Sequence, residues 1–374
     1  MADTIHVSTR KGLFTLKRSP VRRWEIADVA FLGSPLSMSL ADPRDGSWYA
    51  ALNLGHFGAH LHRSCDRGAS WTEVAVPTFP DGATMPERMA SEAETPKMKP
   101  AALSEIWALE PANTGDGTLW CGTIPGGLFR SDDAGESWRL VEGLWNREER
   151  MSWFGGGKDD PGIHSVEVDP NDPQHVLVAI SCGGVWRTRD GGAKWECCSN
   201  GLRAEYMPPD QAYNPNMQDP HRMVACPSYF NFMWIQHHNG IFHSTDGSRN
   251  WEEITNVEPA VFGFTVAVHP HDPGTAWFVP GVKDEMRVPK DAKFIVTKTT
   301  DGGKTFRQIS AGLPSEDAYD IVLRHALDVD STGNLLAMGS TTGNFWVSED
   351  SGESWQAVST HLPPVYAVRF VEER

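Results

Sequence analysis

The sequence lacks any long apolar run: no stretch of its 374 residues approaches the about 18 consecutive apolar residues that a membrane-spanning helix needs. Basic residues are also scarce, with 33 Lys and Arg against 49 Asp and Glu, which gives a formal net charge of −16. Nucleic acids and anionic membranes both attract basic surfaces, so neither is an expected partner. Apolar residues still make up 40% of the chain, which excludes a disordered protein.

Cysteine is equally sparse. The six cysteines are irregularly spaced and form no CxxC pair, so neither a disulfide framework nor a cysteine-based zinc site is predicted. The N-terminal residues lack the basic start, apolar core and cleavage site of a secretory signal. We therefore expect a protein of the reducing cytoplasm.

Tyrosine is rare, with 6 residues, whereas tryptophan is abundant, with 15, and most tryptophans follow a repeat. Six octets share the pattern Ser/Thr-x-Asp-x-Gly-x-x-Trp, with Ser in place of Gly in the fourth octet and Phe in place of Trp in the fifth. Their Asp residues lie between 49 and 67 residues apart, a spacing that suits one four-stranded unit per octet. The octets cover residues 64–71, 131–138, 188–195, 244–251, 299–306 and 348–355.

The residue types of the octet predict a tight turn. Asp and Ser or Thr side chains can accept hydrogen bonds from turn amides, and Gly supplies a position with positive φ. The terminal aromatic residue can fill the space between neighbouring sheets. The octet resembles the Asp-box, or BNR repeat, of the sialidase-like β-propellers within the WD40/YVTN/BNR-like repeat superfamily. This resemblance extends over nearly the whole chain and implies blades of four strands.

A seventh unit is split between the two ends of the chain. Gly12–Phe14 and Trp24 match the third and fourth strands of the other units, and Val365–Phe370 can supply the missing inner strand. Closing the ring in this way removes exposed sheet edges. The sequence therefore predicts an all-β chain forming one domain, residues 1–374. It is a single seven-bladed β-propeller of four-stranded blades, with blade 1 built from residues 1–30 and 363–374.

The alternation of strand direction assigns the octets to one face of the ring, where we expect them to be structural. The starts of the inner strands and the turns between second and third strands share the other face. In Asp-box enzymes the active site lies on the face away from the boxes, so the resemblance places a site there. Aligning the inner strands puts six residues at one equivalent position near the axis: Ser37, Glu105, His164, His221, Phe264 and His325.

Three histidines and one glutamate at equivalent positions predict a metal site at the channel mouth. Imidazole is a common ligand of transition metals, a carboxylate completes many ligand sets, and groups from different blades can converge only at the axis. We predict that His164, His221, His325 and Glu105 hold a divalent ion (Mn, Fe, Zn or Ca). Such an ion would activate a bound water or polarise a carbonyl oxygen. In the alternative interpretation these histidines only bond one another, water or turn carbonyls.

Further candidates surround this position. Glu105, His60, His237 and His238 are predicted to act as acid–base groups or additional ligands. At most one of His237 and His238 should face the site, because adjacent residues of an extended chain point to opposite sides. Substrate-binding residues are predicted to be Trp107 and Trp153, which the blade pattern does not explain, together with Asp219, Arg222 and Arg324.

Long loops should cover the same face. Loops of more than about 15 residues in a compact domain usually act as lids or binding loops. Their aromatic content suits the enclosure of a small ligand. The predicted covering loops are 76–104, 144–162, 203–220 and, in the fifth blade, 283–290.

Three functions remain open. The favoured one is an enzyme that uses the metal site on a small-molecule substrate as a hydrolase, lyase or oxygenase. The second is a sialidase-like glycoside hydrolase, which the resemblance implies. However, the Arg-Ile/Leu-Pro motif of sialidases is missing near the N-terminus, and Arg222 and Arg324 are the only arginines beside the axial positions. The third is a non-catalytic binding or assembly propeller, similar to the photosystem II assembly factors. Oligomeric state is left undecided.

Overall fold

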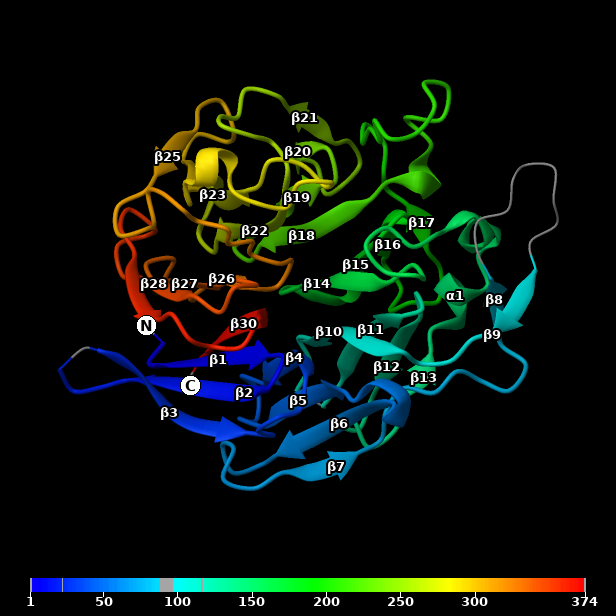
Figure 1. Cartoon of the computed structure of the whole chain (residues 1–374). Helices are drawn as coiled ribbons and strands as arrows, with labels where there is room; N and C mark the ends of the chain where they lie inside the picture. The colour runs from blue at the N-terminus through cyan, green and yellow to red at the C-terminus, as the bar shows by residue number, and fades with distance from the viewer. Residues whose placement is uncertain (1, 22, 88–96, 116, 373–374) are drawn as a thin grey trace.

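The computed structural model describes residues 2–21, 23–87, 97–115 and 117–372. Seven four-stranded antiparallel sheets surround a central axis, with their inner strands near the centre and their outer strands at the periphery (Figure 1). Each inner strand contacts the inner strands of both neighbouring sheets, so the ring is closed. This confirms the predicted all-β, seven-bladed propeller. Among the described residues, no helix is long and apolar enough to cross a membrane.

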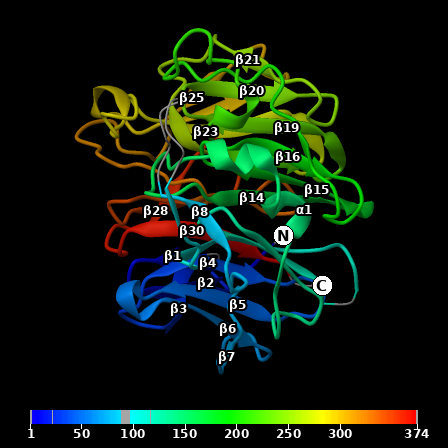
Figure 2. The same cartoon turned by 90° about the vertical axis from the view of Figure 1, so that its right-hand side faces the viewer.

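One blade is built from both ends of the chain. From outside to inside it contains β3 (Trp24–Ala30), β2 (Gly12–Arg18), β1 (Thr4–Thr9) and β30 (Val365–Val371). The register pairs Val7 with Val368, and both side chains are buried. In two perpendicular views β30 lies between β1 and the last complete blade (Figures 1 and 2). The C-terminal strand therefore closes the ring as predicted.

The other six blades follow one another along the chain, and each runs from its inner to its outer strand. The first three are β4 (Leu36–Ala41), β5 (Trp48–Asn53), β6 (Ala59–Ser64) and β7 (Thr72–Val74); β10 (Glu105–Pro111), β11 (Leu119–Ile124), β12 (Leu128–Ser131) and β13 (Arg139–Leu140); and β14 (Ile163–Asp169), β15 (Asp172–Ile180), β16 (Gly184–Thr188) and β17 (Glu196–Cys197). The last three are β18 (Pro220–Cys226), β19 (Tyr229–His237), β20 (Gly240–Ser244) and β21 (Glu252–Ile254); β22 (Gly263–His269), β23 (Asp272–Pro280), β24 (Val296–Thr299) and β25 (Arg307–Ile309); and β26 (Leu327–Val329), β27 (Leu336–Gly339), β28 (Phe345–Ser348) and β29 (Gln356–Ser359).

The octets form the turns between the third and fourth strands. In the second octet the Ser131 hydroxyl donates to Asp133 Oδ1 at 2.8 Å and accepts from the Gly135 N–H at 2.8 Å. Asp133 Oδ1 also accepts from the Ser137 N–H at 2.9 Å. The same three hydrogen bonds recur in the other five octets. The octet Asp side chains are thus engaged by their own turns.

Tryptophan side chains fill the spaces between blades. At the end of the second octet, Trp138 Nε1 donates to the Ala75 carbonyl of the preceding blade at 2.9 Å. Tryptophans of the second strands lie under octet glycines: a Cβ at Gly352 would come within 2.6 Å of Trp277 Nε1. Gly352 also has a φ of +79°, so this position requires glycine. The octets therefore hold neighbouring blades together through packing and hydrogen bonds of their tryptophans.

Short elements lie in the loops between these strands. The predicted covering loop 76–104 contains a two-stranded sheet that projects from the rim (Figure 1), while its residues 88–96 lie outside the described part of the chain. The elements are β8 (Thr84–Pro86), β9 (Met98–Pro100), α1 (Glu142–Trp145) and the 3-10 helices η1 (Gly55–Phe57), η2 (Glu148–Ser152), η3 (Pro215–Met217) and η4 (Lys290–Ala292).

Candidate functional site

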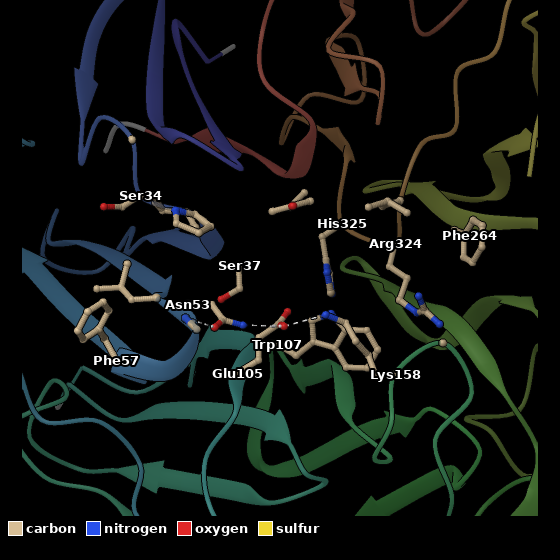
Figure 3. A pocket seen from close by; sticks show the side chains of 18 of the residues that line it. Ser34, Ser37, Asn53, Phe57, Glu105, Trp107, Lys158, Phe264, Arg324 and His325 are labelled. Carbon is tan, nitrogen blue, oxygen red and sulfur yellow. Dashed lines mark hydrogen bonds and ion pairs between the residues drawn. The ribbon is translucent and has the colours of Figure 1, made fainter.

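A cavity of about 720 Å³ opens at the mouth of the central channel, on the face opposite the octets (Figure 3). We call it the mouth cavity. It is lined by the starts of inner strands and by the turn that follows β5, the two kinds of segment that the blade alignment assigns to this face. Four of the six equivalent axial residues line it: Ser37, Glu105, Phe264 and His325.

Glu105 is the carboxylate of the mouth cavity. It begins β10 and is largely buried, and its Oε2 accepts a hydrogen bond from Asn53 Nδ2 at 3.1 Å. The same oxygen pairs with Lys158 Nζ at 2.8 Å, so the side chain lies between Asn53 and Lys158 (Figure 3). No other carboxylate is among the described residues that line the cavity. Glu105 is therefore its candidate for proton transfer.

Arg324 supplies a buried positive charge to the cavity. It precedes β26, is 8% exposed, and lies with its guanidinium carbon 4.9 Å from the Trp107 ring centroid and 5.4 Å from that of Phe264. No described residue accepts a hydrogen bond from this guanidinium, and its Nε is fully buried without a partner. Buried donors without acceptors are costly, and a guanidinium remains charged in proteins. Arg324 thus brings a positive charge to the cavity, and the nearby Asp219 carboxylate interacts with this charge.

The remaining lining combines cations and aromatic rings. Arg287 pairs with Asp284 at 2.6 Å and stands 5.2 Å above the Phe264 ring. Phe57 and Tyr366 also line the cavity. The lining therefore carries three cationic side chains and one carboxylate, although the protein as a whole is strongly acidic.

Asp219, His221 and His238 form a second cluster, which we call the Asp–His cluster. Asp219 Oδ1 accepts hydrogen bonds from the Ser181 hydroxyl at 3.1 Å and the Cys182 N–H at 3.2 Å. Its Oδ2 lies 3.5 Å from His221 Nε2 and 3.4 Å from His238 Nδ1. Within the described residues, this is the one group of three His, Cys, Asp or Glu side chains with the spacing of metal ligands.

Opposing effects act on the Asp219 carboxyl group. Burial raises its pKa, whereas the neighbouring His221 and His238 imidazoles and the charge of Arg324 together lower it, and the net result lies well below the usual range. His221 Nδ1 donates to the Gly263 carbonyl at 2.7 Å, and the ring stacks on Phe264 at 4.7 Å. Since Phe264 also lines the mouth cavity, the Asp–His cluster lies directly behind the cavity wall.

The four predicted metal ligands are not brought together. His325 Nε2 donates to the His164 carbonyl at 2.6 Å, while His164 Nδ1 contacts the Ser165 hydroxyl at 3.0 Å. Burial holds the pKa of both imidazoles well below the ordinary value. Glu105 is engaged by Lys158, and only His221 belongs to the Asp–His cluster. The blade alignment placed these residues at equivalent heights but could not show which way their side chains turn.

Two of the predicted acid–base histidines point away from the mouth cavity. His60 lies on β6, where its Nδ1 contacts Glu73 at 2.6 Å, and this hydrogen bond raises its pKa. His237 is fully buried, and its Nε2 accepts from the Asp219 N–H at 3.1 Å. Burial lowers the pKa of His237 to about 3. Of the adjacent pair, only His238 therefore reaches the Asp219 carboxylate.

The predicted substrate-binding residues do not all lie in the mouth cavity. Trp107 and Arg324 line the mouth cavity. Trp153 is 2% exposed and packs against Trp186 with a centroid separation of 5.7 Å, so it belongs to the core. Arg222 donates to the His164 carbonyl at 3.3 Å and lines a different cavity of about 410 Å³, at the octet end of the channel.

Several lining residues were not predicted as site residues. Lys158 and Arg287 lie in predicted covering loops, where nothing in the sequence showed that they reach the cavity. Asn53 ends β5 on the predicted face, so the same strand alignment that placed Glu105 could have included it.

Comparison with known proteins supports the fold. No protein-family model matches the chain. A xyloglucanase from Hypocrea jecorina (strain QM6a) is 23% identical over 260 residues, which are 65% of this chain and 24% of the xyloglucanase. The chain spans between 10% and 30% of the length of the curated relatives it matches.

Two solved structures share the propeller architecture. The GH74 enzyme of Niastella koreensis superposes with a TM-score of 0.59 at 16% identity, covering 95% of this chain and 52% of that one. YCF48 bound to D1 peptide superposes with a TM-score of 0.52 at 15% identity, covering 94% and 91% of the two chains. At these identities the similarity establishes a common fold: the protein is a seven-bladed β-propeller.

Proposed function

We propose that the protein is a glycoside hydrolase that binds an acidic saccharide in the mouth cavity. The reaction class is supported by the sequence similarity to xyloglucanases. The acidic character of the saccharide rests on one observation: Arg324 is buried beside the cavity and its guanidinium donates no hydrogen bond to a described residue. A sugar carboxylate in the cavity would accept hydrogen bonds from the terminal nitrogens of this guanidinium.

The cavity has the groups that such a reaction needs. Its aromatic side chains, Trp107 and Phe57 among them, offer faces on which a sugar ring can lie, and its volume suits a short saccharide segment. Glu105 transfers the proton, either to the leaving oxygen or from the attacking water. His325 donates from Nε2 to a carbonyl, so Nδ1 of its neutral ring is left to accept a hydrogen bond from water or a hydroxyl.

This arrangement differs from glycosidases that use two carboxylates. Those enzymes place a second carboxyl group about 5–10 Å from the first. Here Glu105 is the single carboxylate in the described lining, and His325 is the second group able to hold a reacting water. We therefore assign the proton transfer to Glu105 and the binding of the acidic sugar to Arg324.

A cleavage assay tests this proposal. The protein is incubated with uronic-acid oligosaccharides and, separately, with neutral xyloglucan oligosaccharides, and new reducing ends are quantified. We expect cleavage of the acidic substrates, and we expect Glu105→Gln to lower kcat by at least about a hundredfold with little change in binding. Glu252→Gln, which removes an exposed carboxylate on β21, is the matched control. Absence of cleavage, or full activity of Glu105→Gln, would contradict the proposal.

A further inference from the structure

We propose that Asp219, His221 and His238 bind a divalent first-row transition metal. The ligand set differs from the four axial residues predicted from the sequence and shares only His221 with it. The three side chains come from the start of β18, its preceding loop and the turn after β19, so three separate backbone positions fix the cluster.

Two of the three side chains, Asp219 and His221, are oriented by hydrogen bonds from their second polar atom. Ser181 and Cys182 hold Oδ1 of Asp219 and leave Oδ2 toward the histidines. His221 donates from Nδ1 to the Gly263 carbonyl, so in the neutral ring Nε2 carries a lone pair that faces this carboxylate oxygen. Metal-bound histidines are typically fixed in this way, with the second ring nitrogen donating to a carbonyl or carboxylate.

The separations fit metal ligands better than hydrogen bonds. Hydrogen bonds between N and O prefer about 2.7–3.2 Å. Here the two nitrogens lie 3.5 and 3.4 Å from Asp219 Oδ2. Ligands placed tetrahedrally around an ion at bond lengths of about 2.1 Å lie about 3.4 Å apart. For His221, whose Nδ1 carries the proton, Nε2 and Asp219 Oδ2 are two lone-pair atoms that repel one another unless a cation lies between them.

The donor types narrow the choice of metal. Two imidazoles and one carboxylate suit Zn²⁺, Fe²⁺, Mn²⁺ or Co²⁺, whereas Ca²⁺ prefers oxygen ligands alone. His238 keeps a quarter of its side chain exposed, so the open coordination position would face solvent on that side. A Cβ at Gly156 would lie 2.9 Å from Asp219 Oδ2, so a glycine is needed where this loop crosses the carboxylate.

Metal uptake tests the proposal without any saccharide. Untagged protein is stripped with a chelator and dialysed against Zn²⁺, and bound zinc is measured by mass spectrometry. Co²⁺ is added in parallel and its visible absorption recorded. We expect about one ion per chain and the absorption of four-coordinate Co²⁺. His238→Ala and His221→Ala should each weaken zinc binding by about a hundredfold or more, with circular dichroism showing that both variants remain folded.

Two control variants separate this proposal from the proposed function. His60→Ala removes a solvent-accessible imidazole on β6, and Glu105→Gln removes the carboxylate of the mouth cavity; both should retain full zinc binding. Failure of the wild-type protein to take up zinc or cobalt would overturn the metal site, and so would unchanged uptake in folded His221→Ala and His238→Ala. Neither result bears on saccharide cleavage by Glu105.

Discussion

At the scale of single residues, ionisable side chains also line the octet end of the channel. Arg369 forms an ion pair with Glu110, and Glu167 accepts a hydrogen bond from the Ala225 N–H at 3.1 Å. Burial raises the pKa of Glu167 to about 7 and that of Asp328 to about 6. These two carboxyl groups therefore take up protons more readily in the folded than in the unfolded chain.

This difference makes stability depend on pH. A carboxyl group with a raised pKa stabilises the folded state fully below its unfolded pKa, and the contribution is lost as pH rises toward the folded pKa. For Glu167 this window runs from about pH 4.5 to about 7. We expect Glu167→Gln to raise the free energy of unfolding on the order of 1 kcal/mol at pH 8.5 and to leave it nearly unchanged at pH 4.5.

Urea unfolding at the two pH values measures this effect. Glu252→Gln, an exposed carboxylate, serves as the control and should change stability little at either pH. If Glu167→Gln changed the free energy of unfolding equally at both pH values, the pKa of Glu167 would be the same in the folded and unfolded chain, which would contradict the prediction.

The sequence predicts the position of a single residue correctly where the repeat determines its place on an inner strand. Because six blades share one pattern, the spacing alone places Glu105 and His325 at the channel mouth. The direction of each side chain does not follow from that pattern, since it depends on non-repeating partners such as Lys158 and Gly263. The predicted metal ligands His164 and His325 therefore lie near the axis without being brought together.

At the scale of elements, the octets form the same turn in six of the seven blades. Each one satisfies backbone N–H groups through its own Asp carboxylate and its own Ser or Thr hydroxyl, independently of distant residues. This local origin explains why the four-stranded blades could be predicted. The covering loops lack such a pattern, so their contacts, including the approach of Lys158 to Glu105, became visible only in the structure.

Asp133→Ala tests the structural role of an octet. The change removes the acceptor for the Ser137 N–H and the Ser131 hydroxyl, and we expect a loss of about 1–3 kcal/mol in the free energy of unfolding. The neighbouring Asp132→Ala removes exposed ion pairs with Arg130 and Arg139 and a long hydrogen bond of 3.4 Å from the Thr118 hydroxyl, and it should cost less than about 1 kcal/mol. Urea unfolding compares the two variants. Equal losses of unfolding free energy would mean that the hydrogen bonds of Asp133 within the octet do not stabilise the protein.

At the scale of the whole molecule, closure of the ring and the distribution of charge define the site. The strand β30 pairs with β1 and brings Tyr366 to the cavity, so both ends of the chain form one blade and the C-terminal strand contributes to the lining. The net charge of −16 repels anions at long range, whereas the mouth cavity gathers Lys158, Arg287 and Arg324. An acidic ligand is therefore attracted to the mouth cavity at short range, because its described lining carries three cationic side chains and one carboxylate.

Calorimetric titration of a uronic-acid oligosaccharide and a neutral oligosaccharide of equal length tests the central claim most directly. We expect the acidic ligand to bind at least about tenfold more tightly, and we expect its affinity to fall as salt is added. Arg324→Met should abolish this preference, while Arg249→Gln, which removes an exposed arginine of the fourth octet, should preserve it. Equal affinity for both ligands, or an undiminished preference in Arg324→Met, would contradict the assignment of the mouth cavity to an acidic saccharide.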